Sequence, residues 1–238
     1  MTTRDLYIVG AGGFARETAQ MLAACLPALG RSLRLLGFLD DNPALTGRSV
    51  DGLPVLGPST GVYDAPYAAV VLCVGSPRDP FARLRLAERL GLPSQRYATV
   101  VHPSASVSVD SVLGPGSVLL AHCVLTAGVR VGAHVAMMPR VVLTHDDEVA
   151  DFATLASGVL LGGGVHVGRG AYVGAGAIVR ENVIIGAGSV IGMGSVVLCD
   201  VPPGEVWVGN PARRLRSVEP ADAAALQPLS AGAGIREG

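Results

Sequence analysis

Every sixth residue between positions 101 and 197 is aliphatic. The seventeen positions are Val101, Val107, Leu113, Leu119, Leu125, Val131, Met137, Leu143, Val149, Leu155, Leu161, Val167, Val173, Val179, Ile185, Ile191 and Val197. A period of six fits neither a helix nor the alternation of a flat sheet. It is typical of a parallel β-helix, in which each hexapeptide is one short strand and stacked coils share a core. The sequence therefore predicts a prism-shaped solenoid.

Two other positions of the repeat are informative. The residue after the aliphatic one is often glycine, which lets the chain turn a corner. The residue four positions after it is nearly always small or β-branched, and Asp147 is the exception. This exception lies beside His145, which makes the segment Thr144–Asp147 a candidate for function.

The N-terminal part has a different pattern, in which short apolar runs alternate with amphipathic stretches. We expect strands at Leu6–Val9, Leu35–Leu39, Pro54–Leu56 and Val70–Val74, and helices at residues 14–29 and Phe81–Leu90. Such an alternation predicts a small, Rossmann-like parallel α/β domain.

The predicted organisation follows from these patterns. It comprises an α/β domain at residues 1–98, a β-helix domain at 99–200, a cap at 201–217 and a disordered tail at 218–238. Pro202 and Pro203 break the six-residue period where the cap begins. The tail is rich in Ala, Gly and Pro, which is typical of a mobile terminus.

Composition limits the classes of function. The formal net charge of −1 is not typical of a nucleic-acid-binding or membrane-surface protein. All 18 basic residues are arginines, which excludes a Schiff-base or P-loop lysine. No apolar run is long enough to span a bilayer and the start lacks a signal peptide, so we expect a cytoplasmic protein. The scattered residues Cys25, Cys73, Cys123 and Cys199 have no metal-ligand spacing, and we expect buried thiols without disulfides.

A glycine-rich turn and an acidic pair mark the α/β domain. The run Gly10-Ala11-Gly12-Gly13-Phe14-Ala15 follows a strand and precedes a helix, where glycines let a phosphate approach the helix N-terminus. Asp40 and Asp41 end the next strand, where a carboxylate can bind a ribose hydroxyl or a base N–H. The turn is as typical of NAD as of a nucleotide sugar. A domain of about 95 residues is too short for a full dinucleotide fold, which favours the nucleotide sugar.

His145 is the candidate general base. A neutral imidazole with a pKa near 6.5 can take a proton from an amine or hydroxyl as it attacks a thioester. A neighbouring carboxylate can orient the ring, and Asp146 is the preferred partner, with Asp147 left open. His102, His122, His134 and His166 have no acidic neighbour in the sequence, so we expect structural or exposed side chains there; His122 and His134 share a repeat phase and could lie near a neighbouring subunit.

The segment Gly209-Asn210-Pro211-Ala212-Arg213 resembles the end of the left-handed β-helix in hexapeptide acyltransferases. Together with the turn YIVGAGGFAR and the strand end GFLDDNP, it resembles the sialic acid O-acetyltransferase family, which includes N-acetyltransferases of the bacillosamine and perosamine type. The similarity covers residues 5–216. It implies an N-terminal α/β domain followed by a left-handed parallel β-helix.

The resemblance also implies a function. It predicts acetyl transfer from acetyl-CoA to the amino group of a nucleotide-linked amino sugar by a cytoplasmic homotrimer without a metal. The implied catalytic residues are His145 and Asp146. The implied substrate-binding residues are Gly10, Gly12, Gly13, Phe14, Asp40, Asp41, Gly75, Ser76 and Arg78. The implied acetyl-CoA-binding residues are Thr154, Gly162, Gly163, Gly164 and Arg213, with Arg214 beside the last.

The chain departs from the family at three places. Phe14 and Thr154 stand where histidines are common, and Met138-Pro139 stands where an asparagine is common. These departures leave open O-acetylation of a sugar or sialic-acid hydroxyl, and a catalytically inactive nucleotide-sugar-binding homologue. A metal enzyme of the γ-carbonic anhydrase type is disfavoured because no HxxxxH pair occurs.

Overall fold

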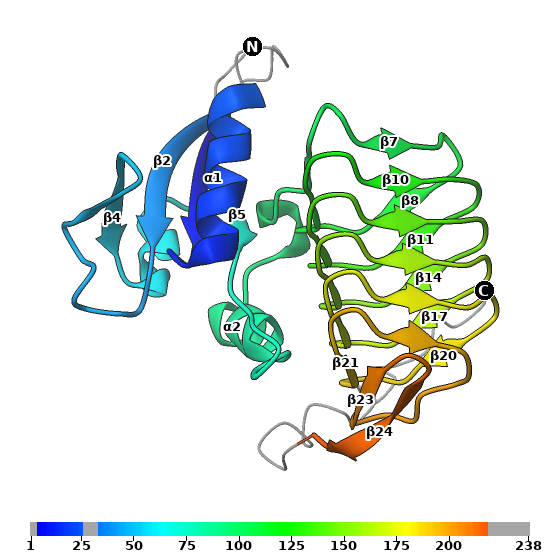
Figure 1. The fold of residues 1–238 in the computed structure, drawn as a ribbon. Helices are drawn as coiled ribbons and strands as arrows, with labels where there is room; N and C mark the ends of the chain where they lie inside the picture. Colours follow the sequence, from blue (N-terminus) through cyan, green and yellow to red (C-terminus); the bar gives the residue numbers. More distant parts are fainter. Residues whose placement is uncertain (1–3, 26–32, 219–238) are drawn as a thin grey trace, which may run out of the picture.

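A small α/β unit and a β-helix stand side by side in the computed structural model, which describes residues 4–25 and 33–218 (Figure 1). The sheet of the first unit has the strand order β3-β4-β2-β1-β5. Its strands are β1 (Arg4–Val9), β2 (Leu33–Leu39), β3 (Ser49–Val50), β4 (Leu53–Gly57) and β5 (Ala69–Leu72). β1 lies between β2 and β5 and is parallel to both, whereas β3 and β4 form an antiparallel pair.

Two helices and two 3-10 turns complete this unit. They are α1 (Gly13–Cys25), α2 (Ala82–Leu90), η1 (Ser59–Tyr63) and η2 (Ser94–Arg96). The predicted parallel α/β pattern is confirmed. The two-residue strand β3 was missed, because a strand this short carries no periodicity. The predicted end of the first helix, at residue 29, lies outside the described residues.

The β-helix is built from two-residue strands. They are β6 (Val100–Val101), β7 (Ser106–Val107), β8 (Val112–Leu113), β9 (Val118–Leu119), β10 (Val124–Leu125), β11 (Arg130–Val131), β12 (Ala136–Met137), β13 (Val142–Leu143), β14 (Glu148–Val149), β15 (Thr154–Leu155), β16 (Leu160–Leu161), β17 (His166–Val167), β18 (Tyr172–Val173), β19 (Ile178–Val179), β20 (Ile184–Ile185), β21 (Val190–Ile191) and β22 (Val196–Val197). Each strand ends at one of the seventeen periodic aliphatic residues, which confirms the predicted fold class.

Every third strand pairs in parallel, so one coil contains 18 residues and the prism has three faces. Face 1 contains β6, β9, β12, β15, β18 and β21; face 2 contains β7, β10, β13, β16, β19 and β22; face 3 contains β8, β11, β14, β17 and β20. We name the turns between faces corner 1/2, corner 2/3 and corner 3/1. Corner 2/3 is opposite face 1.

Two sets of inward side chains fill the prism. The periodic aliphatic residues form one set, in which Leu119, Leu143 and Leu155 are fully buried. The residues four positions later, such as Val141 and Val159, form the other. Burying these aliphatic side chains stabilises the stack by about 1.5–3 kcal/mol for each large one.

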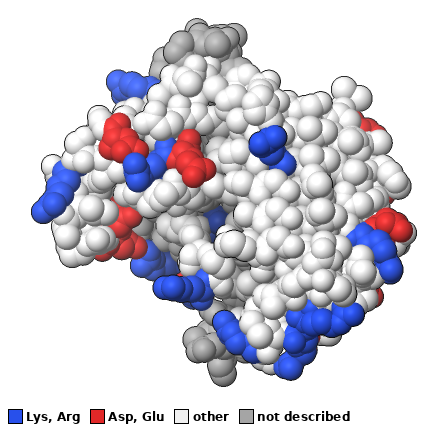
Figure 2. Space-filling view, in the orientation of Figure 1, with Lys and Arg blue, Asp and Glu red and all other residues white. Residues whose placement is uncertain are grey.

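The N-terminal unit packs on face 1. Leu6, Ala15 and Met21 of this unit share one apolar cluster with Val118 and with Leu120, at the end of face 1. Its charged side chains stand out in Figure 2, where the visible surface of the β-helix is largely uncharged above the strands β23 and β24.

The chain leaves the hexapeptide pattern in an antiparallel hairpin, β23 (Glu205–Gly209) and β24 (Ala212–Ser217). β23 pairs with β21 and so continues face 1. The disordered tail predicted at residues 218–238 lies outside the described residues from 219 onward. Cys25, Cys73 and Cys123 are buried as predicted, but Cys199, which follows β22 at corner 2/3, is exposed. In the described ranges, no helix is long and apolar enough to cross a membrane.

Candidate functional site

His145 and Asp146 form an exposed pair at corner 2/3. The distance from His145 Nδ1 to Asp146 Oδ2 is 2.9 Å. The two side chains are 68% and 76% exposed to solvent, so a second molecule can reach the imidazole. Asp146 has a φ of 62°, a left-handed conformation that Asp tolerates. With a carboxylate on Nδ1, the ring presents Nε2 as its proton acceptor.

Gly163 lies one coil later, 18 residues after His145, directly against the imidazole. A Cβ atom on Gly163 would be 2.3 Å from His145 Nε2, which is closer than any real contact. Only glycine therefore leaves room for the ring in this position. The sequence predicted a close approach of a ligand at this glycine, and the structure shows that the imidazole of His145 approaches it.

The three glycines predicted to bind acetyl-CoA differ in their backbone N–H groups. The N–H of Gly162 donates to Val179 O and that of Gly164 donates to His145 O, each at 2.9 Å. The N–H of Gly163 donates to no acceptor within the described part of the chain. Gly163 is thus the member of the trio with a free donor beside the imidazole.

Asp147 has a structural position that the neighbouring Asp146 does not share. Its side chain is fully buried and takes the inward place that small residues fill in other repeats. Oδ2 accepts from Thr144 N at 2.7 Å and Oδ1 accepts from Val165 N at 2.8 Å. Burial raises the pKa of this carboxyl to about 6. Asp147 therefore joins two coils, and of the two candidates Asp146 contacts the ring.

The glycine-rich turn follows β1 at the carboxyl edge of the sheet. Gly10 has a φ of 104° and a Cβ there would meet Cys73 O at 2.7 Å, so the turn requires glycine. Gly12 and Gly13 instead face open space at the start of α1. Asp40 holds the turn, because its Oδ2 accepts from Ala11 N at 2.8 Å. An anion at the N-terminus of α1 would be favoured by the free N–H groups of its first turn.

The same edge gathers other predicted substrate-binding residues. Asp41, after β2, accepts from Ser59 N at 2.9 Å and forms an ion pair with Arg89. Gly75 and Ser76 follow β5, and Ser76 Oγ accepts from the Arg78 N–H at 3.2 Å. Because β2, β1 and β5 are adjacent and parallel, their carboxyl ends bring these turns together. The Arg78 side chain is exposed.

Other predicted residues lie apart from His145. Thr154 is on β15 of face 1, where its hydroxyl accepts from Arg83 at 2.8 Å. Phe14, the second residue of α1, lies near the same guanidinium, whose Cζ is 6.0 Å from the ring centroid. Arg213 is exposed on β24, and Arg214 beside it pairs with Glu205 at 2.8 Å.

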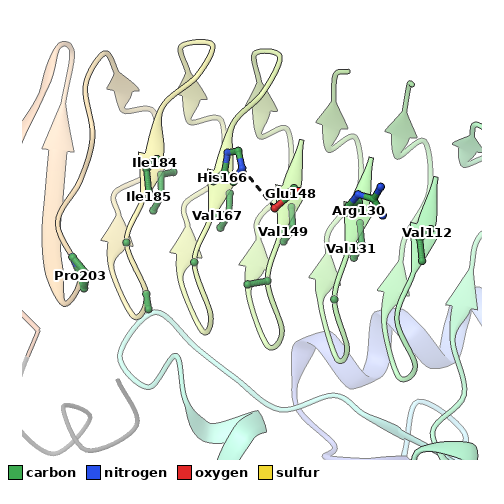
Figure 3. A pocket seen from close by; sticks show the side chains of 15 residues that line it. Val112, Arg130, Val131, Glu148, Val149, His166, Val167, Ile184, Ile185 and Pro203 are labelled. Atoms are coloured by element: carbon green, nitrogen blue, oxygen red, sulfur yellow. Dashed lines mark ion pairs between the residues drawn. The ribbon is translucent and has the colours of Figure 1, made fainter. Parts of the chain in front are cut away.

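Face 3 carries a groove of about 580 Å³ (Figure 3). Arg130, Glu148 and His166 point outward from three adjacent strands, with Val112 and Ile184 beyond them. His166 Nε2 is 3.5 Å from Glu148 Oε2. The sequence interpretation that His166 lacks an acidic neighbour was incomplete, because the partner is 18 residues away and only the coil brings the two together.

A second groove, of about 620 Å³, separates α1 from corner 1/2. Gly13, Arg16 and Asp51 line it from the N-terminal unit, and Pro139 and Ser157 line it from the β-helix. Arg16 and Asp51 form an ion pair with an N–O distance of 2.7 Å. A ligand at the glycine-rich turn thus has room beside the β-helix.

Sequence reasoning missed the residues that join the two units. His134 is buried between Tyr97 and Phe152, with ring centroids 4.4 and 4.9 Å away, and burial lowers its pKa to about 4. It therefore packs against its own N-terminal unit, whereas the sequence leaves open a position near a neighbouring subunit. Arg83, on α2, is 2% exposed and donates to carbonyl groups of the β-helix. Neither residue carried a signal in the sequence, because both act through tertiary contacts.

Metal-ligating side chains do not gather in this protein as far as the structure describes it. Over residues 4–25 and 33–218, no group of three or more His, Cys, Asp or Glu could hold an ion.

Family models match both parts of the chain. The PglD N-terminal domain matches residues 5–90, and the bacterial transferase hexapeptide (six repeats) matches residues 164–199. The two matches correspond to the α/β unit and to the later coils of the β-helix.

Solved structures with the whole architecture are similar. The acetyltransferase domain of PglB from Neisseria gonorrhoeae FA1090, in complex with acetyl coenzyme A, is 30% identical with a TM-score of 0.78, and the match covers 90% of this chain and 100% of that one. PerB from Caulobacter crescentus, in complex with CoA and GDP-perosamine, is 28% identical with a TM-score of 0.77, covering 89% and 97%.

A curated relative is similar over a shorter length. UDP-N-acetylbacillosamine N-acetyltransferase from Bacillus subtilis (strain 168) is 33% identical over 125 residues. The match covers 50% of this chain and 52% of the relative, so the chain spans about half the length of the curated relative it matches.

Proposed function

Since the chain belongs to the hexapeptide-repeat acetyltransferases that carry a PglD N-terminal domain, we propose that it transfers an acetyl group from acetyl-CoA to the amino group of a nucleotide-linked amino sugar. The names of its relatives include a UDP-N-acetylbacillosamine N-acetyltransferase and a GDP-perosamine N-acetyl transferase. They support the family, and the sialic acid O-acetyltransferase branch stays a prediction.

The observation that carries the proposal is the exposed His145–Asp146 pair beside Gly163. Acetyl-CoA supplies the acetyl group as an activated thioester. His145 Nε2 accepts the proton that the acceptor amine loses as its nitrogen bonds to the acetyl carbon. Asp146 keeps the proton on Nδ1 and stabilises the imidazolium. The imidazolium returns the proton to the sulfur as the carbon–sulfur bond breaks.

Gly163 supplies a hydrogen-bond donor for the thioester. Its N–H is free of partners in the described residues and lies beside the base. An amide in this position can donate to the thioester oxygen as negative charge develops there. Gly162 and Gly164, whose N–H groups donate to the neighbouring coils, hold Gly163 in place.

The carboxyl edge of the α/β sheet would hold the acceptor. Gly12 and Gly13 leave open space at the start of α1, where a diphosphate has access to free N–H groups. Asp40 and Asp41 are fixed by hydrogen bonds at the neighbouring strand end, where the nucleoside would lie. The groove beside Gly13 gives the sugar room next to the β-helix.

A homotrimer would complete the site. His145 is at corner 2/3, opposite the face that holds its own N-terminal unit, so the acceptor has to come from another copy. Face 2 presents an outward column of aliphatic side chains, in which Leu160 and Ile178 are 41% and 45% exposed. Val124, Val142 and Val196 continue this column. A β-helix trimer would bury such a column.

The test is steady-state thiol release from acetyl-CoA with UDP-, dTDP- and GDP-linked 4-amino sugars. We expect a sustained rate with one member of the panel. His145→Ala lowers this rate by roughly 10²–10⁴ without loss of folding. His166→Ala is the matched control, because it removes another exposed His–acid pair and leaves the rate within about threefold of wild type.

Two results would overturn the proposal. Wild-type turnover in His145→Ala would remove the base from the mechanism. Tight nucleotide-sugar binding without acetyl transfer would identify an inactive homologue. Because the exposed Cys199 can react once with acetyl-CoA, only a rate that depends on acceptor counts.

A further inference from the structure

Arg83 is an arginine buried where the two units meet, at the carboxyl edge of the α/β sheet. Its side chain is 2% exposed, and no carboxylate pairs with it in the described parts of the chain. Burial lowers its pKa to about 10, so the guanidinium keeps its charge at pH 7. A buried charge without a counter-charge is costly, and an anion nearby reduces that cost.

The hydrogen bonds of Arg83 connect this edge to two coils of the β-helix. Nη1 donates to Val74 O at 2.8 Å, immediately before Gly75. Nε donates to His134 O at 2.8 Å, and Nη2 donates to Phe152 O at 2.9 Å. Further acceptors of Nη2 are Ala153 O at 3.2 Å and Thr154 Oγ1 at 2.8 Å.

One N–H group of Arg83 has no acceptor among the described residues. A guanidinium has five N–H groups, of which Nη1 carries two. Nη1 has a single acceptor, Val74 O, among the described residues. The same atom is 3.1 Å from the place that a Cβ on Gly75 would take. The unpaired donor is therefore on the atom next to Gly75, the glycine that follows β5.

The position is also where the sheet changes direction. β1 is followed in the chain by α1 and β2 on one side, and β5 lies on its other side. In open parallel sheets, ligands bind at the carboxyl ends of such neighbouring strands. Here the edge presents two turns, the open one at Gly12 and Gly13 after β1 and the one at Gly75 after β5. The guanidinium of Arg83 lies next to Gly75.

We propose that Arg83 makes this edge selective for an anionic ligand, the diphosphate of the nucleotide-linked acceptor, and fixes the edge on the β-helix. This inference rests on the proposed function for the identity of the ligand. The charge of Arg83 attracts the diphosphate, and the unpaired N–H of Nη1 is its donor. The other hydrogen bonds set the position of the bound acceptor relative to the prism.

Paired binding measurements by calorimetry test the inference. The probes are GDP, UDP and dTDP, each compared with its uncharged nucleoside. In the wild type, we expect one diphosphate to bind more tightly than its nucleoside. Arg83→Met lowers the affinity for this diphosphate by about 10- to 100-fold, the range for loss of a charged hydrogen bond, and changes nucleoside affinity by less than about threefold. Arg83→Lys keeps the charge and retains part of the selectivity.

Arg96 provides the matched control. It is also a buried arginine of the N-terminal unit, at 9% exposure, and it donates to carbonyls, those of Ala68, Val62 and Ala65. All three acceptors lie within its own unit. Arg96→Met should therefore lower thermal stability while the diphosphate-to-nucleoside ratio stays at the wild-type value.

The outcomes separate the two proposals. The role of Arg83 is overturned if Arg83→Met leaves the ratio of diphosphate affinity to nucleoside affinity unchanged, or if Arg96→Met lowers this ratio equally. Either result counts even if the wild type acetylates a sugar. An Arg83-dependent ratio in a protein that acetylates no sugar overturns the proposed function alone. If Arg83→Met does not fold, folded Arg83→Lys decides the matter. Because lysine keeps the positive charge, a full loss of the preference for the diphosphate over its nucleoside in this variant would overturn the role of the charge. A wild type that binds none of the three diphosphates overturns both.

Discussion

At the scale of single residues, substitution of Gly163 is the sharpest test of the proposed role of His145. A methyl group there would be 2.3 Å from His145 Nε2, so Gly163→Ala must displace the imidazole. Because His145 is exposed, the ring can move out without disturbing the core. We expect kcat to fall by about 10- to 100-fold, as for other displaced catalytic groups, with an unchanged melting temperature. Steady-state kinetics and thermal unfolding measure the two effects.

A double-mutant cycle provides the control. If the methyl group acts through the imidazole, Gly163→Ala has no further effect on kcat in the His145→Ala background. An additive loss in the double variant would contradict this interpretation and indicate that the methyl group obstructs a substrate directly.

Asp146 and Asp147 are neighbours with opposite expected effects. Asp147→Ala leaves the buried N–H groups of Thr144 and Val165 without acceptors, which costs about 1–3 kcal/mol for each. The melting temperature should therefore fall clearly. Asp146→Ala removes only an exposed partner of the ring, so the melting temperature stays constant and kcat falls by about 10- to 100-fold. Calorimetry and turnover of both variants measure these effects. A reversed pattern would contradict the roles given to the two residues.

At the scale of the element, the turn before α1 offers a matched pair of substitutions. Gly12 has open space around its missing Cβ, so both alanine and aspartate fit there. Gly12→Asp adds a negative charge where we place the diphosphate, and its KM for the acceptor should rise at least about tenfold. Gly12→Ala adds volume without charge and changes KM by less than about threefold. KM for acetyl-CoA is the internal control, because equal changes in both KM values would place the turn elsewhere in the mechanism.

The β-helix could be predicted strand by strand because one constraint repeats. Each coil needs inward aliphatic side chains at fixed intervals, and the period of six records them directly. The same arithmetic places residues 18 apart on neighbouring coils. It could have identified the contacts of His145 with Gly163 and of Glu148 with His166.

The contacts between the two units could not be predicted in this way. Arg83 and His134 meet because α2 packs on corner 3/1, and no period relates a helix to that corner. Thr154 was assigned to acetyl-CoA by its position after His145, yet face 1 directs it to Arg83. The residue type alone does not distinguish a cofactor ligand from an acceptor of an arginine hydrogen bond.

At the scale of the whole molecule, the two halves of the proposed site lie on different sides of the prism. The glycine-rich turn belongs to the unit on face 1, and His145 is at the opposite corner. The units are tied together by Arg83, by Phe81 against Gly170, and by packing of His134. A swing of the N-terminal unit around the prism would break all of these contacts. We therefore propose that transfer occurs between copies of the chain.

Co-expression of two impaired variants, assayed at an acceptor concentration well below the wild-type KM, tests transfer between copies. Gly12→Asp keeps its own His145, and His145→Ala keeps its own glycine-rich turn. In a randomly mixed trimer, a site built from two chains pairs an intact turn with an intact histidine in about a quarter of cases, by the statistics of a cyclic assembly. We therefore expect about a quarter of the wild-type rate. A site within one chain would give only the residual rate of the Gly12→Asp chains, since neither chain has both parts intact.

The control for this experiment is co-expression of His145→Ala with the double variant Gly12→Asp/His145→Ala. This mixture forms the same hybrid trimers but contains no intact base, so its rate should stay at the level of His145→Ala alone. Sedimentation reports whether trimers form in each mixture. Trimers that form without any recovered rate in the first mixture would contradict transfer between copies, and they would require the N-terminal unit to leave face 1 and reach its own His145 during each turnover.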